Sequence, residues 1–142
     1  MTEKVLLVDD EKDFVEALGE RMENRGMNVT TTTSATDAIA RVKAESYDAV
    51  VLDLQMPEMD GIQVLKAIKE IKPEMQIILL TGYATVEKGI EAIKMGAMDL
   101  IEKPADIAII TEKIKKAQAR KMILVEKKTE EKIKKILSSK GW

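Results

Sequence analysis

The chain has 142 residues, of which 45% are apolar and 34% charged, as expected of one domain that can bury a core. It contains no cysteine and no histidine, which excludes disulfides, thiolate metal sites, Ser-His-Asp triads and most zinc sites. No apolar run approaches the roughly 20 residues of a membrane helix, and the first residues lack the apolar stretch of a secretory signal. We therefore expect a cytoplasmic protein without membrane contact, whose chemistry depends on carboxylates, hydroxyls, Lys, Arg and the backbone.

Five short β-type segments alternate with helical patterns along the chain. The segments cover residues 4–8, 28–32, 49–52, 76–80 and 98–101. The first, third and fourth are almost entirely apolar, which is typical of parallel strands buried on both faces. The second is rich in threonine and suits a sheet edge. Strict alternation of strand and helix predicts an α/β protein with a parallel sheet and right-handed crossovers.

Glycines and capping residues mark the ends of the helices between these strands. The expected helices cover residues 12–24, 34–45, 60–72 and 85–95. Ser34 and Asp60 are suitable N-terminal caps, while Gly26 and Gly96 follow the last turns of the first and fourth helices. In the fourth helix, the apolar residues expected to face the core are Val86, Ile90 and Ile93.

The last helical segment is longer than a five-stranded sheet requires, since no Gly or Pro occurs between Ala105 and Lys140. Its first apolar stripe, expected to cover the sheet, consists of Ile107, Ile110, Ile114 and Ala117. A second stripe follows at Met122, Val125, Thr129, Ile133 and Ile136. We expect a domain over residues 1–120 and a helical tail over 121–142, which mediates self-association or leads to a further domain.

The net charge of -2 conceals an uneven distribution of charge. Residues 106–142 contain 11 Lys and Arg against 5 Asp and Glu, a net charge of +6, which leaves -8 for residues 1–105. A basic tail can bind nucleic acid, but a solvated helix face is the simpler interpretation. No aromatic residue lies within the basic stretch, so we expect no direct contact with nucleic acid.

Carboxylates follow two of the apolar strands. Asp9 and Asp10 come directly after the first strand, and Asp53 comes directly after the third. The carboxyl ends of parallel strands meet at one edge of the sheet, where open α/β sheets bind ligands. Three crowded carboxylates require proton uptake or a bound cation. Without His or Cys, a hard cation such as Mg²⁺ is the natural choice, with Mn²⁺ as its substitute.

Two further strand ends add a hydroxyl, a backbone amide and an ammonium group. Thr81 and Gly82 follow the fourth strand, and Lys103 follows the fifth. Together with a metal ion, these groups suit a phosphoryl group on a carboxylate, because they neutralise its charge and bind its oxygens. Asp53 stands alone on a central strand, so it is the best candidate for a nucleophile that forms an aspartyl-phosphate. The pair Asp9 and Asp10 is then left to hold the ion.

Each of these residues also has a purely structural interpretation. Asp9 and Asp10 could cap the following helix, and Asp53 could cap a loop. Thr81 could be an ordinary strand-end residue, and Lys103 a solvated surface lysine. Their common position immediately after predicted strands favours a functional site.

Five short motifs, in this order and at this spacing, resemble the receiver domain of two-component response regulators over about residues 4–118. The motifs are Val8-Asp9-Asp10-Glu11, Asp53-Leu54-Gln55-Met56-Pro57 with Asp60-Gly61, Leu80-Thr81-Gly82-Tyr83-Ala84, Gly96-Ala97-Met98-Asp99 and Glu102-Lys103-Pro104. Each motif alone is weak, but the full set is highly specific. The resemblance implies a flavodoxin-like (CheY-like), doubly wound five-stranded parallel sheet of order 2-1-3-4-5, with an extended C-terminal helix here.

The resemblance also implies roles for the site residues. Asp53 would accept a phosphoryl group from a histidine kinase or a histidine phosphotransfer protein. Asp10, Asp53 and the backbone carbonyl of Gln55 would bind Mg²⁺, with Asp9 bound through water. Thr81 and Lys103 would sense the phosphoryl group, with the amide of Gly82 beside it, and would signal to the face formed by the fourth helix, fifth strand and fifth helix. A homodimer would form through that face or through the tail. The peptide bond between Lys103 and Pro104 would be cis.

Two positions depart from the receiver pattern. Leu100 stands where receivers commonly carry a Tyr or Phe that rotates during switching, and Ala105 stands where a Phe often follows the Lys-Pro pair. We expect the phosphorylation chemistry to tolerate both changes.

On this interpretation we do not expect a turnover enzyme that acts on external substrates. Two other classes of protein compete with it. A phosphatase of haloacid-dehalogenase type would require a second Asp as general acid where Gln55 stands, and an amide cannot transfer that proton. A flavodoxin-like carrier of nucleotide or flavin would require a Gly- or Ser/Thr-rich phosphate loop in place of residues 9–11, which are all acidic.

Overall fold

A five-stranded parallel sheet forms the centre of the computed structural model, which describes residues 2–82 and 86–139. The strands are β1 (Lys4–Val8), β2 (Asn28–Thr32), β3 (Ala49–Asp53), β4 (Ile77–Thr81) and β5 (Asp99–Glu102). Their order is β2-β1-β3-β4-β5, which confirms the predicted topology, and the threonine-rich β2 lies at an edge.

Three strands end one residue later than the sequence pattern predicts. Asp53 and Thr81 are the last residues of β3 and β4 rather than the first residues after them. The third such strand, β5, runs from Asp99 to Glu102 instead of from 98 to 101. The ladder continues because Asp53 pairs with Leu80 and Thr81 pairs with Glu102. The two polar side chains are therefore held by the sheet itself.

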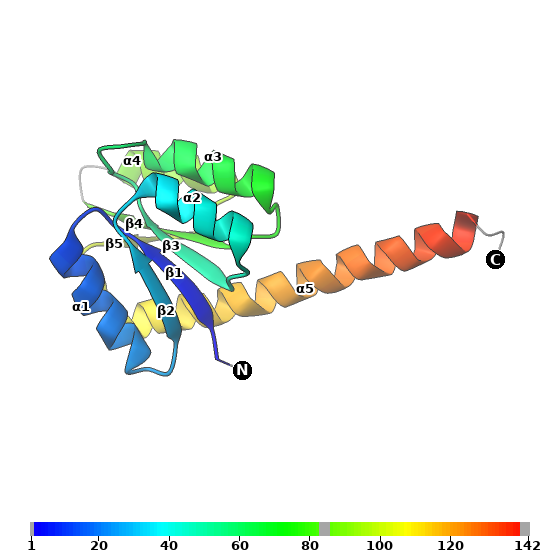
Figure 1. Cartoon of the computed structure of the whole chain (residues 1–142), viewed down its shortest axis with the longest axis horizontal. Helices are drawn as coiled ribbons and strands as arrows, with labels where there is room; N and C mark the ends of the chain where they lie inside the picture. The colour runs from blue at the N-terminus through cyan, green and yellow to red at the C-terminus, as the bar shows by residue number, and fades with distance from the viewer. Residues whose placement is uncertain (1, 83–85, 140–142) are drawn as a thin grey trace.

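The helices cover both faces of the sheet (Figure 1). They are α1 (Lys12–Glu23), α2 (Ala35–Ala44), α3 (Gly61–Ile71), α4 (Val86–Lys94) and α5 (Ile107–Ser139). Helices α2, α3 and α4 pack on one face, and α1 and α5 on the other (Figure 1). Alternate residues of each strand supply the two cores: Leu6 and Val8 point to the first, Val5 and Leu7 to the second.

Local hydrogen bonds fix the helix ends as predicted. The Ser34 hydroxyl accepts from the backbone N–H of Asp37 at 3.1 Å. Asp60 and Gln63 form a reciprocal capping box at the start of α3. Gly26 and Gly96 adopt φ values of 89° and 109°, the left-handed conformation that glycine adopts without strain.

The predicted core face of α4 is wrong. Ile90 and Ile93 are 50% and 40% exposed, whereas Gly89 and Ala92 are buried. A Cβ atom on Gly89 would lie 2.6 Å from Leu100 Cδ1, so the helix approaches β5 closely through its small residues. The larger isoleucines are displaced to the flanks of this contact. The predicted start at Thr85 and the side chain of Val86 lie outside the described part of the chain.

Helix α5 begins on the sheet and continues far beyond it (Figure 1). Ile110, Ile114 and Ala117 are buried as predicted. Two lysines tie the helix to the domain where it leaves the sheet: Lys121 Nζ donates to the Ser46 hydroxyl at 2.8 Å and to the Tyr47 carbonyl at 2.7 Å, and Lys128 Nζ lies 3.6 Å from Glu74 Oε2. From residue 122 to 139 every side chain is exposed. No helix among the described residues is long and apolar enough to cross a membrane.

Candidate functional site

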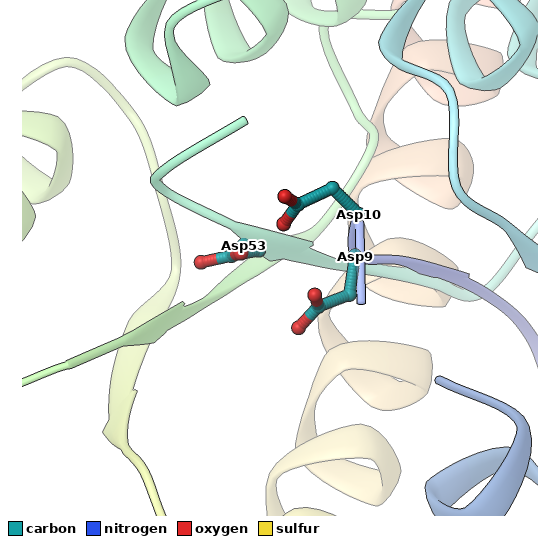
Figure 2. Close-up of side chains that lie close together, drawn as sticks. All are labelled: Asp9, Asp10 and Asp53. Carbon is teal, nitrogen blue, oxygen red and sulfur yellow. The ribbon is translucent and has the colours of Figure 1, made fainter. Parts of the chain in front are cut away.

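Three aspartates converge at the carboxyl edge of the sheet. Asp9 and Asp10 follow β1, Asp53 ends β3, and these two strands are hydrogen-bonded neighbours. One carboxylate oxygen from each lies within 4.8 Å of the others. The close-up shows the three carboxylates on the same side of the strand ends (Figure 2). The predicted convergence of these residues is therefore present in the fold.

The three carboxylates differ in their exposure and contacts. Asp9 is fully buried and Asp53 nearly so, whereas Asp10 is exposed. Asp9 Oδ1 accepts the backbone N–H of Glu11 at 2.9 Å, a local turn before α1. The N-cap of α1 is Glu11, which makes no side-chain cap. Capping α1 therefore does not account for the burial of Asp9.

Lys103 joins the acidic cluster from the end of β5. Its Nζ lies 2.8 Å from Asp9 Oδ2, 3.7 Å from Asp53 Oδ2 and 3.8 Å from Glu11 Oε1. The surface-lysine alternative is therefore wrong, since this side chain is mostly buried among carboxylates. The peptide bond that follows, to Pro104, is cis as the receiver resemblance implied.

Sequence reasoning missed two neighbours of Lys103. The Phe14 ring centroid lies 4.5 Å from its Nζ, a cation–π contact, and Glu11 adds a third carboxylate. The two residues are three apart at the start of α1, which places them on one side of the helix. This three-residue spacing, in a chain with few aromatic residues, was the only feature of the sequence that could have indicated that Phe14 and Glu11 both contact Lys103.

The environment shifts the proton affinities of two groups. Burial, reinforced by the charge of Asp9, raises the pKa of Asp53 from 3.8 to about 6 against the opposing effects of the Gln55 N–H and Lys103. Burial lowers the pKa of Lys103, but its hydrogen bond to Asp9 and the charge of Asp53 outweigh that effect and raise the pKa overall. Lys103 is therefore a permanent cation here, while Asp53 is a carboxylate poorly compensated for its burial.

The remaining predicted residues surround the same edge. Thr81 is buried, and its hydroxyl donates to the Gly82 carbonyl at 2.9 Å. The backbone N–H of Lys103 donates to the Thr81 carbonyl at 2.8 Å, so β4 positions the lysine. Gln55 lies beside Asp53 and donates its backbone N–H to Oδ1 at 3.3 Å. Tyr83 and Ala84 of the third motif lie outside the described residues.

The donor set fits a hard divalent cation. Asp9, Asp10 and Asp53 offer only oxygen, the ligand that Mg²⁺ prefers, and Lys103 alone cannot neutralise three carboxylates. A cation at this position would supply positive charge for a bound anionic oxygen.

The chain belongs to the response regulator receiver domain family, whose pattern matches residues 5–115. This agrees with the parallel sheet and the acidic edge described above.

Named relatives are regulators of bacterial transcription and photosynthesis. The chain is 38% identical over 115 residues to the transcriptional regulatory protein ZraR of Salmonella typhimurium, covering 81% of this chain and 26% of ZraR. It is 40% identical over 109 residues to the photosynthetic apparatus regulatory protein RegA of Rhodobacter capsulatus, covering 75% of this chain and 58% of RegA. The chain thus spans between about a quarter and three fifths of these relatives.

Solved structures show the same fold. A response regulator receiver domain protein from Clostridium thermocellum superimposes with a TM-score of 0.82 at 32% identity, covering 86% of this chain and 98% of the other. NtrX from Brucella abortus superimposes with a TM-score of 0.83 at 27% identity, covering 89% of this chain and 29% of the other.

Proposed function

We propose that the protein is a phosphorelay switch in which Asp53 accepts a phosphoryl group in a Mg²⁺-dependent reaction. The observation that carries this proposal is the convergence of three carboxylates within 4.8 Å, with Lys103 in contact with two of them. Asp53 is nearly buried, yet its pKa of about 6 keeps it ionised at neutral pH. It is thus a carboxylate nucleophile at the edge where the sheet binds ligands.

The transfer forms one bond and breaks another. An oxygen of the Asp53 carboxylate attacks the phosphorus of the donor while the bond from phosphorus to the donor nitrogen or oxygen breaks. The donor keeps the electron pair of that bond, and the product is an aspartyl-phosphate. We propose a histidine kinase or a histidine phosphotransfer protein as the donor in the cell.

Lys103, Thr81 and Gly82 have proposed roles on the phosphoryl oxygens. Lys103, whose Nζ lies 3.7 Å from Asp53 Oδ2, would neutralise the negative charge of the phosphoryl group. The Thr81 hydroxyl and the Gly82 amide would donate hydrogen bonds to the phosphoryl oxygens. Asp10, Asp53 and the Gln55 carbonyl would hold Mg²⁺ or Mn²⁺, with Asp9 acting through water. Because this charge arrives where Lys103 now holds Asp9, a change of partner for Lys103 is the proposed first event of signalling.

We place this switch in the cytoplasm and assign it no turnover of external substrates. Residues 1–120 would form the receiver and 121–142 a tail or linker. The output face would include α4, β5 and α5, on which Ile90, Ile93 and Ile109 leave apolar side chains exposed. A homodimer would use that face or the tail.

Phosphorylation by acetyl phosphate with Mg²⁺ tests the assignment. Intact mass should show one added phosphoryl group, lost when EDTA replaces Mg²⁺ and absent in Asp53→Asn. The control Asp13→Asn removes an exposed carboxylate in the first turn of α1 and should be labelled like the unmodified protein.

Labelling that persists in Asp53→Asn would contradict the proposed acceptor. Rapid turnover of a generic phosphate ester would instead support the phosphatase alternative.

A further inference from the structure

The first turn of α1 places an aromatic ring over the ammonium group of Lys103. Phe14, the only phenylalanine of the chain, lies with its ring centroid 4.5 Å from Lys103 Nζ. The ring itself is fixed by the core, since Phe14 is partly buried and packs against the apolar cluster beneath α1 and α5. The fold therefore holds the ring beside the lysine, and the lysine does not have to hold the ring.

This contact meets the conditions under which a cation–π interaction is strong. The attraction grows as the cation is removed from water, and the Lys103 side chain is only 20% exposed. By comparison, Lys4 Nζ lies 5.3 Å from the centroid of the Tyr47 ring, and the Lys4 side chain is 42% exposed. The contact at Lys103 is both shorter and better shielded from water, so it should restrain its lysine more.

The carboxylates around Lys103 do not by themselves fix its ammonium group. Of the three described carboxylates near Nζ, only that of Asp9 is within hydrogen-bond distance, at 2.8 Å. Those of Asp53 and Glu11 lie at 3.7 and 3.8 Å. A lysine ammonium is a compact charge with three donors on a flexible stem, so one hydrogen bond allows it to rotate about Asp9. The ring supplies the further contact that keeps it near Asp53.

A ring can hold a lysine without supplying a competing hydrogen-bond acceptor. The attraction acts between the positive charge and the electron-rich face of the ring, so no N–H group has to point at one acceptor atom. The donors that Asp9 does not accept can then turn toward the oxygens of a phosphoryl group on Asp53. A further carboxylate in place of the ring would compete with those oxygens for both the charge and the donors.

From these observations we propose that Phe14 is a positioning residue for phosphoryl transfer. Its ring keeps the Lys103 ammonium beside Asp53 and leaves donors available for the phosphoryl oxygens. The inference rests on the proposed function of Asp53 and Lys103, and it adds a residue of α1 to that site. Phe14 acts through Lys103 and not on the reacting atoms.

The rate of labelling by acetyl phosphate with Mg²⁺ tests this role. Phe14→Leu keeps an apolar side chain but removes the ring, and should be labelled about tenfold more slowly than the unmodified protein. Phe14→Tyr retains the ring and should restore the rate to within about twofold. Val29→Ala is the control for packing, because Val29 is partly buried against the same cluster from β2; its rate should be unchanged. A Phe14→Leu rate equal to that of the unmodified protein would overturn the proposal.

A double-mutant cycle on stability shows whether Phe14 acts through Lys103. Lys103→Met keeps the length of the side chain and removes its charge. In urea unfolding at pH 7, Phe14→Leu should lower the folding equilibrium constant by a factor about five to ten times larger in the unmodified protein than in Lys103→Met. Equal losses in the two backgrounds would show that Phe14 only packs, and would overturn the proposal.

Because the chain has one phenylalanine, the contact can also be observed directly. With isotope-labelled phenylalanine, NMR should show one ring with a nuclear Overhauser effect to lysine side-chain protons, and this effect should disappear in Lys103→Met. Its absence in the unmodified protein would overturn the proposal. Failure of acetyl phosphate to label the unmodified protein would overturn the proposed function, and the positioning role with it. Normal labelling of Phe14→Leu would overturn the positioning role alone.

Discussion

Asp53 lies where its burial and the charge of Asp9 both oppose ionisation, and only the Gln55 N–H and Lys103 favour it. A metal-free protein at neutral pH therefore carries an unfavourable charge in its site. The Asp53 carboxyl binds a proton more tightly in the native state than in the unfolded state. The stability contributed by this protonation is therefore full below about pH 4 and is lost as pH rises through about 6.

Removing that charge should stabilise the metal-free protein. In EDTA at pH 7, Asp53→Asn should unfold at a higher denaturant concentration than the unmodified protein. We expect its free energy of unfolding to be larger by about 1–3 kcal/mol. The two should converge as pH falls to 4, because Asp53 is then protonated. Urea unfolding curves between pH 4 and 7 measure the difference, and a difference independent of pH would contradict the assigned pKa.

Gly61 illustrates how the backbone near the site limits substitution. A Cβ atom there would lie 2.7 Å from Leu54 Cα and 2.8 Å from the Leu54 carbonyl oxygen. Since neither backbone atom can rotate away, Gly61→Ala should destabilise the fold by about 1–3 kcal/mol in thermal or urea unfolding. Gly82→Ala is the matched control, because a Cβ there meets no atom within 4 Å; equal losses would contradict the steric cause.

The acidic site could be predicted from sequence because its members lie at strand ends or directly after them. In a parallel sheet, a strand end fixes the edge at which a side chain lies, so the sequence alone predicted that Asp9, Asp53 and Lys103 meet. Phe14 could not be predicted there, since it enters through the packing of α1. The chemical roles of all the site residues, Thr81, Gly82 and Gln55 included, remain predictions.

At the scale of elements, α5 serves two environments with one sequence pattern. Its first turns bury Ile110 and Ile114 against the sheet, and its later turns lie in solvent. Apolar periodicity predicted both stripes, and the first was correctly expected to cover the sheet. In α4, by contrast, periodicity selected Ile90 and Ile93, while the close contact of Gly89 with Leu100 decided the buried face.

The two environments of α5 should differ sharply in mutational cost. Ile114→Ala removes a fully buried side chain and should lower the free energy of unfolding by about 2–5 kcal/mol. Ile109→Ala makes the same change on the same helix at a residue that is 44% exposed, and should cost less than about 0.5 kcal/mol. Urea unfolding at a fixed protein concentration compares them; similar costs would show that α5 does not pack as described.

At the scale of the whole molecule, a cation bound by the acidic edge would link ligand binding to folding. Mg²⁺ should raise the thermal unfolding midpoint progressively with its concentration. At a concentration one hundred times its dissociation constant, the gain in the free energy of unfolding should be about 2.7 kcal/mol. NaCl at matched ionic strength should not reproduce the effect. The shift should be smaller in Asp10→Asn; an undiminished shift in that variant would place the cation elsewhere.

Sequence and structure agree on the overall architecture because its determinants are local and repeated. Apolar strands alternate with capped helices, and each Gly or cap marks an end, so order and type could be assigned segment by segment. The division at residue 120 remains a prediction, since α5 continues across it without interruption.

That continuity makes α5 a lever. Residues 122–139 extend about 27 Å at 1.5 Å per residue, and the helix contains no glycine or proline at which it could hinge. A tilt of about 5° where α5 rests on the sheet would displace its far end by roughly 2 Å. Small rearrangements of the domain would therefore be amplified mechanically along this rigid arm, with no need for the tail to touch the acidic edge.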